Sequence, residues 1–372
     1  MKTADAVIVG AGIVGAACAG ALAEEGLRVI VVESGAAGGG ATAAGMGHIV
    51  AMDDSGEQWA LTSYSRDLWR RLSPLLPPEA AYDPCGTIWV ASGQEEMDAA
   101  RRKADFFAEH GARAEVLDAH SLKEAEPNLR AGLAGVVLIP DDCVVYPPSV
   151  AQWLIHRARG RGACIRTGIP VAEIGKGGVR LEDGSHIAAG WTVCATGSWA
   201  RTLVPSLEIH PRKGHLAITD RYPGFLQRQV MELGYSSSAH GSQRESVAFN
   251  VQPRTTGQVL IGSSRQFGET SGSVDRAMLA RMLGRAIEYM PGLAALDVIR
   301  VWTGFRAATP DRLPLIGPCP DREGVYLATG HEGLGSTTSL ATARLLADQI
   351  LKRRPAIPVE PYLPARFGAA HE

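Results

Sequence analysis

Arg306 lies in one of the least polar stretches of the chain, the segment WTGFRAATPDRLPLIG at residues 302–317. A guanidinium keeps its charge at physiological pH, and burying it without a partner is costly. Its side chain therefore reaches water, pairs with an internal acid such as Asp311 or Glu332, or binds an anionic ligand. In the last case it would offer a carboxylate two parallel hydrogen bonds.

A glycine pattern near the N-terminus points to a second kind of chemistry. Gly10, Gly12 and Gly15 follow the apolar run AVIV at residues 6–9 and precede helix-forming residues that end at Gly26. This order predicts a strand, a tight turn and a helix whose first N–H groups can face phosphates. Gly12 would let a pyrophosphate approach the backbone, and Gly15 would let helix and strand pack closely.

A second apolar run, RVIVV at residues 28–32, ends in Glu33. Together the two runs and the intervening helix form the βαβ unit that carries a dinucleotide fingerprint. Glu33 would accept hydrogen bonds from both ribose hydroxyls of an adenosine. The same carboxylate would repel the 2′-phosphate of NADP, so we expect FAD or NAD rather than NADP.

Two further glycine-rich stretches favour the longer of these cofactors. Residues 38–48 are nearly all small and come shortly after Glu33. Residues 330–338 lie between a predicted strand at 325–329 and a predicted helix at about 339–352. A bare backbone can lie against a ligand along many atoms, and a helix N-terminus can hold an anionic edge. An NAD-dependent dehydrogenase would explain only the first turn, whereas an FAD would use all three.

The composition is that of a globular protein. The 372 residues are 45% hydrophobic and 20% charged, with a formal net charge of −2 and 43 glycines. This balance gives no electrostatic argument for a nucleic-acid partner, and no apolar run is long enough to span a membrane. The six cysteines show no metal-binding spacing, and the first residues do not form a signal peptide, so we expect no metal and a cytoplasmic location.

The chain resembles the family of FAD-dependent amino acid oxidases and dehydrogenases that includes D-amino acid oxidase, glycine oxidase and sarcosine oxidase. The motifs that carry the resemblance are VIVGAGIVG, VVES, GATAAGMG, CATGSW, GFRAATPDRLPLIG and GHEGLGSTTS. Within the family, AAGM at residues 43–46 looks like glycine oxidase. The combination GMGHIVAMDD looks like bacterial D-hydroxyproline dehydrogenases, which the chain resembles most.

The resemblance implies an α/β chain, α+β overall. A Rossmann-like FAD-binding domain would be built from residues 1–83, 144–212 and 301–372. A substrate domain with an antiparallel sheet would comprise residues 84–143 and 213–300.

The resemblance also implies the site residues. Arg306 would bind the substrate carboxylate, and Met46 and His48 would approach the flavin ring. The expected cofactor-binding residues are Gly10, Gly12, Ile13, Val14, Gly15, Glu33, Ser34, Gly40, Ala41, Thr42, Ala44, Gly45, Met46, Val171, Ala195, Gly197, Trp199, Arg306, His331, Gly333, Leu334, Gly335, Ser336 and Thr337. His215 is expected where the chain crosses between domains. Lys213 and Arg265 are expected in solvent, with contact between either of them and the substrate as the alternative.

Two departures from the family pattern refine these expectations. Gly304 stands where the covalent-flavin branch has a cysteine, which predicts non-covalent FAD. Gly333 stands where some members have a second cation, so Arg306 would hold the carboxylate alone.

The implied reaction is oxidation of the C–N bond of a small amino or imino acid, with hydride transfer to flavin N5. The preferred substrate is D-hydroxyproline or D-proline. The alternatives are a glycine, sarcosine or D-amino acid oxidase that releases H2O2, and a flavin subunit of a larger dehydrogenase complex. The electron acceptor stays open among oxygen, a quinone and a partner subunit.

Overall fold

The computed structural model describes residues 3–234 and 244–368, so part of the predicted 213–300 segment lies outside the described residues. The chain divides into two compact units. The first comprises Met1–Ala80, Tyr146–Pro211 and Phe305–Glu372, and the second comprises Ala81–Val145 and Arg212–Gly304. The sequence predicts the corresponding boundaries after residues 83, 143, 212 and 300. Which unit binds cofactor and which binds substrate stays a prediction.

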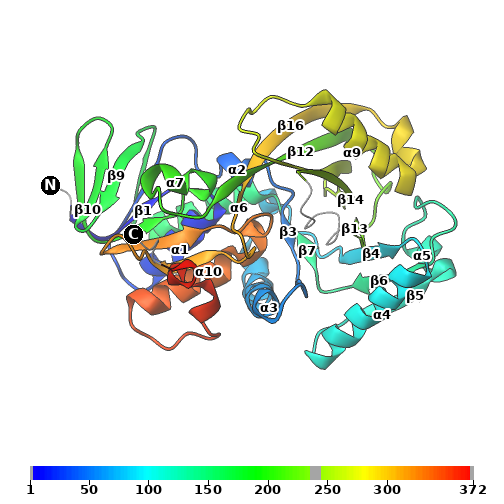
Figure 1. Cartoon of the computed structure of the whole chain (residues 1–372), viewed down its shortest axis with the longest axis horizontal. Helices are drawn as coiled ribbons and strands as arrows, with labels where there is room; N and C mark the ends of the chain where they lie inside the picture. The colour runs from blue at the N-terminus through cyan, green and yellow to red at the C-terminus, as the bar shows by residue number, and fades with distance from the viewer. Residues whose placement is uncertain (1–2, 235–243, 369–372) are drawn as a thin grey trace. The chain divides into compact units, whose positions relative to one another are not determined.

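A mainly parallel sheet forms the centre of the first unit (Figure 1). Its strand order is β17-β18-β11-β1-β2-β8, and only β17 runs antiparallel to its neighbour along this path. The bounds are β1 Thr3–Val9, β2 Val29–Glu33, β8 Cys164–Thr167, β9 Val171–Gly175, β10 Gly178–Leu181, β11 His186–Cys194, β17 Leu315–Pro318 and β18 Val325–Thr329. The paired strands β9 and β10 extend from β11 off this path.

Helices complete the first unit. They are α1 Ile13–Glu24, α2 Gly40–Ala43, α3 Gly56–Leu72, α6 Pro147–Gly160, α7 Ala200–Leu203 and α10 Gly335–Ile350, with the short strand β3 His48–Ile49 and 3-10 turns η1 Ser73–Leu75, η2 Pro78–Ala80, η3 Gly197–Trp199, η5 Glu360–Tyr362 and η6 Pro364–Phe367. Helix α1 is rich in alanine and mostly buried, because it packs against both α6 and α10. Helix α10 packs in turn against α3.

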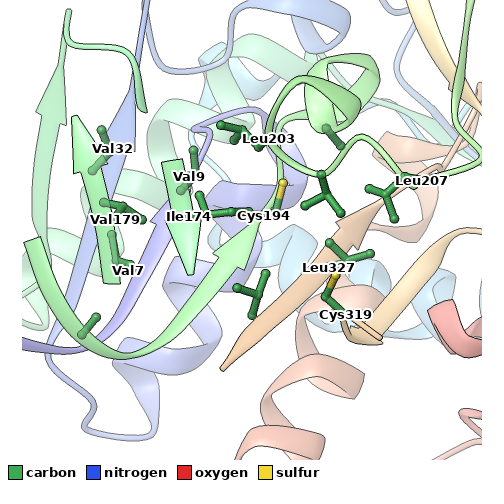
Figure 2. Packing of buried hydrophobic residues seen from close by; sticks show 14 of the residues in the cluster. Val7, Val9, Val32, Ile174, Val179, Cys194, Leu203, Leu207, Cys319 and Leu327 are labelled. Atoms are coloured by element: carbon green, nitrogen blue, oxygen red, sulfur yellow. The ribbon is translucent and has the colours of Figure 1, made fainter. Parts of the chain in front are cut away.

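One face of the first sheet carries a continuous apolar core (Figure 2). Val7 and Val9 of β1 point into the same cluster as Ile174 and Val179 of the β9–β10 hairpin, and Leu203 of α7 joins them. Fully burying each such valine or leucine side chain stabilises the fold by about 1.5–3 kcal/mol. This packing fixes β1, and with it the position of the glycine turn that follows.

The second unit is built on an eight-stranded sheet of order β16-β12-β15-β14-β13-β4-β6-β5. Its elements are β4 Thr87–Ala91, α4 Gln94–Glu109, β5 Glu115–Asp118, α5 Ala119–Ala125, β6 Gly135–Ile139, β7 Cys143–Val144, β12 His210–Arg221, β13 Gln229–Glu232, β14 Glu245–Pro253, β15 Gln258–Phe267, α9 Arg276–Tyr289, η4 Pro291–Ala295 and β16 Val298–Ala308. Two of these strands extend past its boundaries, because residues 210–211 of β12 and 305–308 of β16, Arg306 among them, belong to the first unit. The predicted α/β class is confirmed. The sheet is mixed rather than purely antiparallel, because β13 pairs with β4 in parallel.

Two basic residues that were expected in solvent are buried in this second sheet. Lys213 is 2% exposed and Arg265 is 4% exposed. Lys213 lies on β12 and Arg265 on β15. Both strands are interior strands of the sheet, with a neighbouring strand on each side. The prediction that these two charges lie in solvent is therefore wrong, because the sequence alone does not show which strands lie next to β12 and β15.

His215 also has a structural place. Its Nδ1 lies 2.8 Å from Ser264 Oγ, and its Nε2 accepts a hydrogen bond from Asp275 N–H at 3.0 Å. The ring thus joins β12 to β15 and to the residue that caps α9. Both ring nitrogens are used within the second unit, just past the boundary at residue 211.

All six cysteines are free thiols. Within residues 3–234 and 244–368, no helix is both long and apolar enough to cross a bilayer.

Candidate functional site

The first glycine turn joins β1 to α1 and allows no side chain at two of its positions. Gly10 has a φ of +104°, and a Cβ there would lie 2.5 Å from the carbonyl oxygen of Ala195. A Cβ on Gly15 would lie 2.1 Å from the carbonyl oxygen of Gly10. Helix α1 therefore begins directly against the end of β1, with its first N–H groups at the carboxyl edge of the parallel sheet.

Glu33 lies beside this turn at the end of β2. Its Oε2 accepts the N–H of Ala11 at 2.7 Å, and its Oε1 accepts the N–H of Gly35 at 2.8 Å. Ser34 Oγ lies 3.4 Å from the same Oε1. Each carboxylate oxygen can accept more than one hydrogen bond, so Glu33 keeps acceptor capacity for ligand hydroxyls while the backbone holds it in place.

The second glycine-rich stretch lies on the N-terminus of α1. Thr42, in the short helix α2, accepts a hydrogen bond from the N–H of Ile13 at its Oγ1, at 3.0 Å. The N–H of Gly38 donates to the carbonyl of Ala11 at 2.8 Å. A Cβ on Gly12 would come within 3.1 Å of Thr42 Oγ1. Two stretches that are about 30 residues apart in the sequence thus form one glycine-lined surface.

The third glycine stretch begins α10 earlier than the sequence predicts. The helix starts at Gly335 rather than near residue 339, so Ser336 and Thr337 lie in its first turn. Gly, Ser and Thr have low helix propensity, so the sequence pattern does not predict that the first turn of α10 is helical. No side chain caps the helix, and its first N–H groups have no intrahelical partner. They form the positive end of the helix dipole.

A hydroxyl in that first turn brings the second and third stretches together. Thr337 Oγ1 donates to the carbonyl of His48 at 2.8 Å and lies 3.4 Å from the N–H of Val50. Trp69 of α3 holds the same turn, with its Nε1 at 3.2 and 3.1 Å from the carbonyls of Ser336 and Thr337. Trp69 belongs to no recognisable motif, and sequence reasoning missed it.

Arg306 lies beside the third glycine stretch. A Cβ on Gly333 would be 3.8 Å from Arg306 Nε, and the N–H of Glu332 donates to the carbonyl of Ala307 at 2.9 Å. The residue next to the guanidinium stem is thus a glycine, which adds no second charge. Arg306 is half-buried at the end of β16.

One of the two acids that could have paired with Arg306 has another partner. Asp311 receives hydrogen bonds from Arg366, at 2.6 Å from Nε and 3.0 Å from Nη2. Burial alone would raise the pKa of Asp311, but the bonds from Arg366 hold that pKa below its usual value. This bidentate pair fixes the loop after Arg306 to the C-terminal segment.

Every residue that the sequence assigns to the site lies in the first unit. Ala195 and Gly197 follow β11, and Thr329 at the end of β18 donates from Oγ1 to the carbonyl of Gly197 at 2.9 Å. Val171 begins β9 and packs on the core of the unit. Trp199 is 68% exposed.

His331 is buried in the third stretch and bonds to α10. Its Nε2 lies 2.9 Å from Thr342 Oγ1, and burial lowers the pKa of His331 to about 3. The imidazole is therefore neutral at physiological pH. It can position the turn between β18 and α10, but it cannot supply a second positive charge beside Arg306.

This shift predicts a pH dependence of stability. The pKa of a histidine in an unfolded chain is about 6.5. Below that pH His331 is protonated in the unfolded chain but stays neutral in the folded chain. His331 should therefore lower the free energy of unfolding by about 2 kcal/mol between pH 7.5 and pH 5, and have no effect above pH 7.5. Urea unfolding of the wild type and of His331→Gln at both pH values measures it. Equal pH dependence in the two proteins would contradict the assignment.

These features together define the class as a dinucleotide-binding protein. Its parallel sheet carries a glycine turn of the dinucleotide type, two further glycine stretches lie near that turn, and Arg306 lies beside the third stretch. The chain matches the model of the family described as "DAO: FAD dependent oxidoreductase" over residues 5–349. It is 30% identical to the glycine oxidase of Geobacillus kaustophilus, covering 96% of both chains, and 28% identical to the glycine oxidase of Pseudomonas aeruginosa, covering 96% of this chain and 98% of that one.

Solved structures agree with the family match. The crystal structure of glycine oxidase from Geobacillus kaustophilus aligns with a TM-score of 0.88 at 28% identity, covering 100% of both chains. The structure of L-proline dehydrogenase from P. horikoshii aligns with a TM-score of 0.88 at 23% identity over 98% of each chain and is similar in fold. The chain belongs to the DAO family of FAD-dependent oxidoreductases.

The residues of the first unit fit FAD. A Cβ at Gly10 or Gly15 would meet backbone atoms, so the turn keeps a bare surface, and Glu33 lies at the position that suits the ribose. The first turns of α1 and α10 direct N–H groups toward anionic parts of a ligand. The three glycine stretches form a bare backbone along which such a long ligand can extend.

Proposed function

We propose that the protein is a glycine- or sarcosine-type oxidase of a small amino acid. FAD would lie along the three glycine stretches, and the substrate carboxylate would bind Arg306. The observation that carries the proposal is the place of Arg306, half-buried and beside the third glycine stretch, with Gly333 contributing no competing charge. The glycine oxidases that the chain resembles over nearly its whole length support the choice of substrate.

Arg306 would bind and orient the substrate. Its guanidinium matches a carboxylate in a bidentate geometry, which fixes the α-carbon relative to the protein. When bound, FAD supplies the acceptor for the hydride that leaves the α-carbon. Holding that carbon in one orientation lowers the entropic part of the barrier. The N-terminus of α10 would stabilise negative charge near the third stretch.

Two further residues, His331 and Gly304, bear on the charge near the site and on how FAD is held. His331 is neutral, so the amine of the substrate meets no imidazolium from this residue. We also propose that FAD is held without a covalent bond, because Gly304 offers no thiol. Denaturation with acid followed by filtration should then release the flavin into the filtrate. The cytoplasmic location stays a prediction.

Anaerobic reduction tests the proposed substrate. The purified protein is mixed with glycine, sarcosine, D-alanine, D-proline, L-proline or cis-4-hydroxy-D-proline, and the flavin absorbance is followed. We expect glycine and sarcosine to bleach the flavin band, and air to restore it with one H2O2 per substrate oxidised.

The other outcomes separate the alternatives. Bleaching by cyclic imino acids alone would favour the D-hydroxyproline or D-proline dehydrogenase predicted from the sequence. Bleaching without recovery in air would indicate a quinone or a protein as electron acceptor. No bleaching by any substrate would favour a flavin subunit that needs its partners.

A further inference from the structure

Four helices of the first unit surround a cavity of about 310 Å³. They are α1, α3, α6 and α10: α1 packs against α6 and α10, and α10 packs against α3. On α1 the cavity is lined from Ala17 to Glu24, and on α10 from Leu340 to Arg344. It therefore uses the later turns of two helices whose first turns lie at the glycine stretches, and it is separate from the site described above.

The interior of the cavity is apolar. Small residues of α1, including Ala17 and Gly20, leave room between the helices, and the lining also includes Leu68 and Leu72 of α3 and Leu154 of α6. Leu75, at the edge, is 59% exposed. An exposed leucine that continues an apolar cavity is typical of a surface that a ligand covers.

The rim of the cavity is strongly basic. It carries Arg71, Arg157, Arg161 and Arg344 but a single carboxylate, that of Glu24. Glu24 bonds to Arg161 at 3.3 Å and to Arg344 at 2.8 Å, so its charge is already shared. Arg344 also pairs with Glu25 at 3.7 Å, so it is the most neutralised of the four rim cations. Within the described ranges Arg71 pairs with no carboxylate, and Arg157 stacks over Trp153 at 4.8 Å. The rim thus keeps an excess of positive charge next to an apolar interior.

We propose that this cavity binds a small amphipathic carboxylate, a short apolar chain or ring that ends in one anionic group. The guanidinium groups would hold the carboxylate, and the leucines would cover the apolar part. The volume lies at the lower end of the range for small-molecule pockets, about 300–1,000 Å³, which suits a free ligand rather than a bilayer surface. A bound ligand would hold α1, α3, α6 and α10 together and raise the thermal stability of the folded protein.

Octanoate is the probe that tests the proposal on the FAD-loaded protein. Calorimetric titration should show saturable binding of one octanoate per chain, with a rise in Tm that grows with ligand concentration. Acetate, which lacks the apolar chain, and octanol, which lacks the charge, should each bind at least tenfold more weakly.

Two variants and a matched control locate the binding. Arg71→Glu reverses one rim charge, whereas Arg70→Glu reverses its exposed neighbour, which pairs with Asp67 and lies outside the cavity. Gly20→Leu fills the cavity, because a Cβ at Gly20 meets no atom within 4 Å. We expect Kd for octanoate to rise at least tenfold in Arg71→Glu and in Gly20→Leu, and to stay unchanged in Arg70→Glu.

Three results would overturn the proposal. The first is equal octanoate affinity in Gly20→Leu and the wild type, which would place the binding elsewhere. The second is an absence of saturable binding. The third is co-sedimentation with phosphatidylglycerol vesicles without affinity for free octanoate, which would identify the surface as one that binds membranes.

Discussion

Arg306→Ala is expected to lower kcat/KM for the amino acid substrate by a factor of about 30 to several thousand, with the flavin content unchanged. Truncating one partner of a hydrogen-bonded charge pair costs about 2–5 kcal/mol, and about 1.4 kcal/mol corresponds to a tenfold change. Most of the loss should fall on KM, because the carboxylate is bound in the ground state as well as in the transition state. Steady-state kinetics with the substrate identified by anaerobic reduction measures the change.

Two further variants show whether the effect depends on the guanidinium at this position. Arg306→Lys tests its geometry, and Arg300→Ala tests the removal of another arginine on the same strand. Lysine keeps the charge but loses the two-pronged geometry, so its kcat/KM should fall between those of the wild type and Arg306→Ala. Arg300 is exposed on the same strand, where it stacks over Trp302 at 5.2 Å, and its removal should leave the kinetics unchanged. A KM that is the same in Arg306→Ala and the wild type would remove the carboxylate assignment.

Gly15→Ala is expected to give a protein that retains less than a tenth of the wild-type FAD. The new Cβ would lie 2.1 Å from the carbonyl oxygen of Gly10, and both atoms belong to the dinucleotide turn. Overpacking of this kind forces backbone shifts that cost about 1–3 kcal/mol or more. The shift would displace the first N–H groups of α1, which are the groups that we propose hold the phosphates. The ratio of flavin absorbance to protein absorbance measures the loss.

Gly284→Ala is the matched control for this change. Gly284 lies within α9 and is exposed, and a Cβ added there would meet no atom within 4 Å. Alanine there should raise the free energy of unfolding by about 0.5–1 kcal/mol, because glycine is the weaker helix former, and should leave the FAD content unchanged. Full FAD content in Gly15→Ala, at wild-type stability, would contradict the close packing at the turn.

The sequence predicts the parts of the site that local patterns determine. The first βαβ unit has apolar runs, glycine spacing and a terminal acid in one continuous stretch, so β1, α1 and β2 follow from it with small changes at their ends. Strand β18 has the predicted bounds for the same reason. The start of α10 was predicted late, because its first turn is held by tertiary bonds from His48 and Trp69 rather than by helix propensity.

Contacts between distant residues could not be predicted in this way. The pair between Asp311 and Arg366 spans 55 residues, and the burial of Lys213 and Arg265 depends on the order of the strands in the second sheet. The choice of D-hydroxyproline as substrate rests on one local motif, GMGHIVAMDD at residues 45–54, whereas the glycine oxidases match the chain over nearly its whole length.

The strand order of the first unit has a consequence for synthesis of the protein. Strand β1 pairs with β2 and β11, and β11 pairs with β18, which ends only at Thr329. The dinucleotide turn therefore leaves the ribosome long before the strand and helix that complete its surroundings. Pairings between such distant segments close large loops and slow folding. The nascent chain must keep its apolar first strands from aggregating until β18 and α10 have been made, and the three glycine stretches that fit FAD come together only after that point.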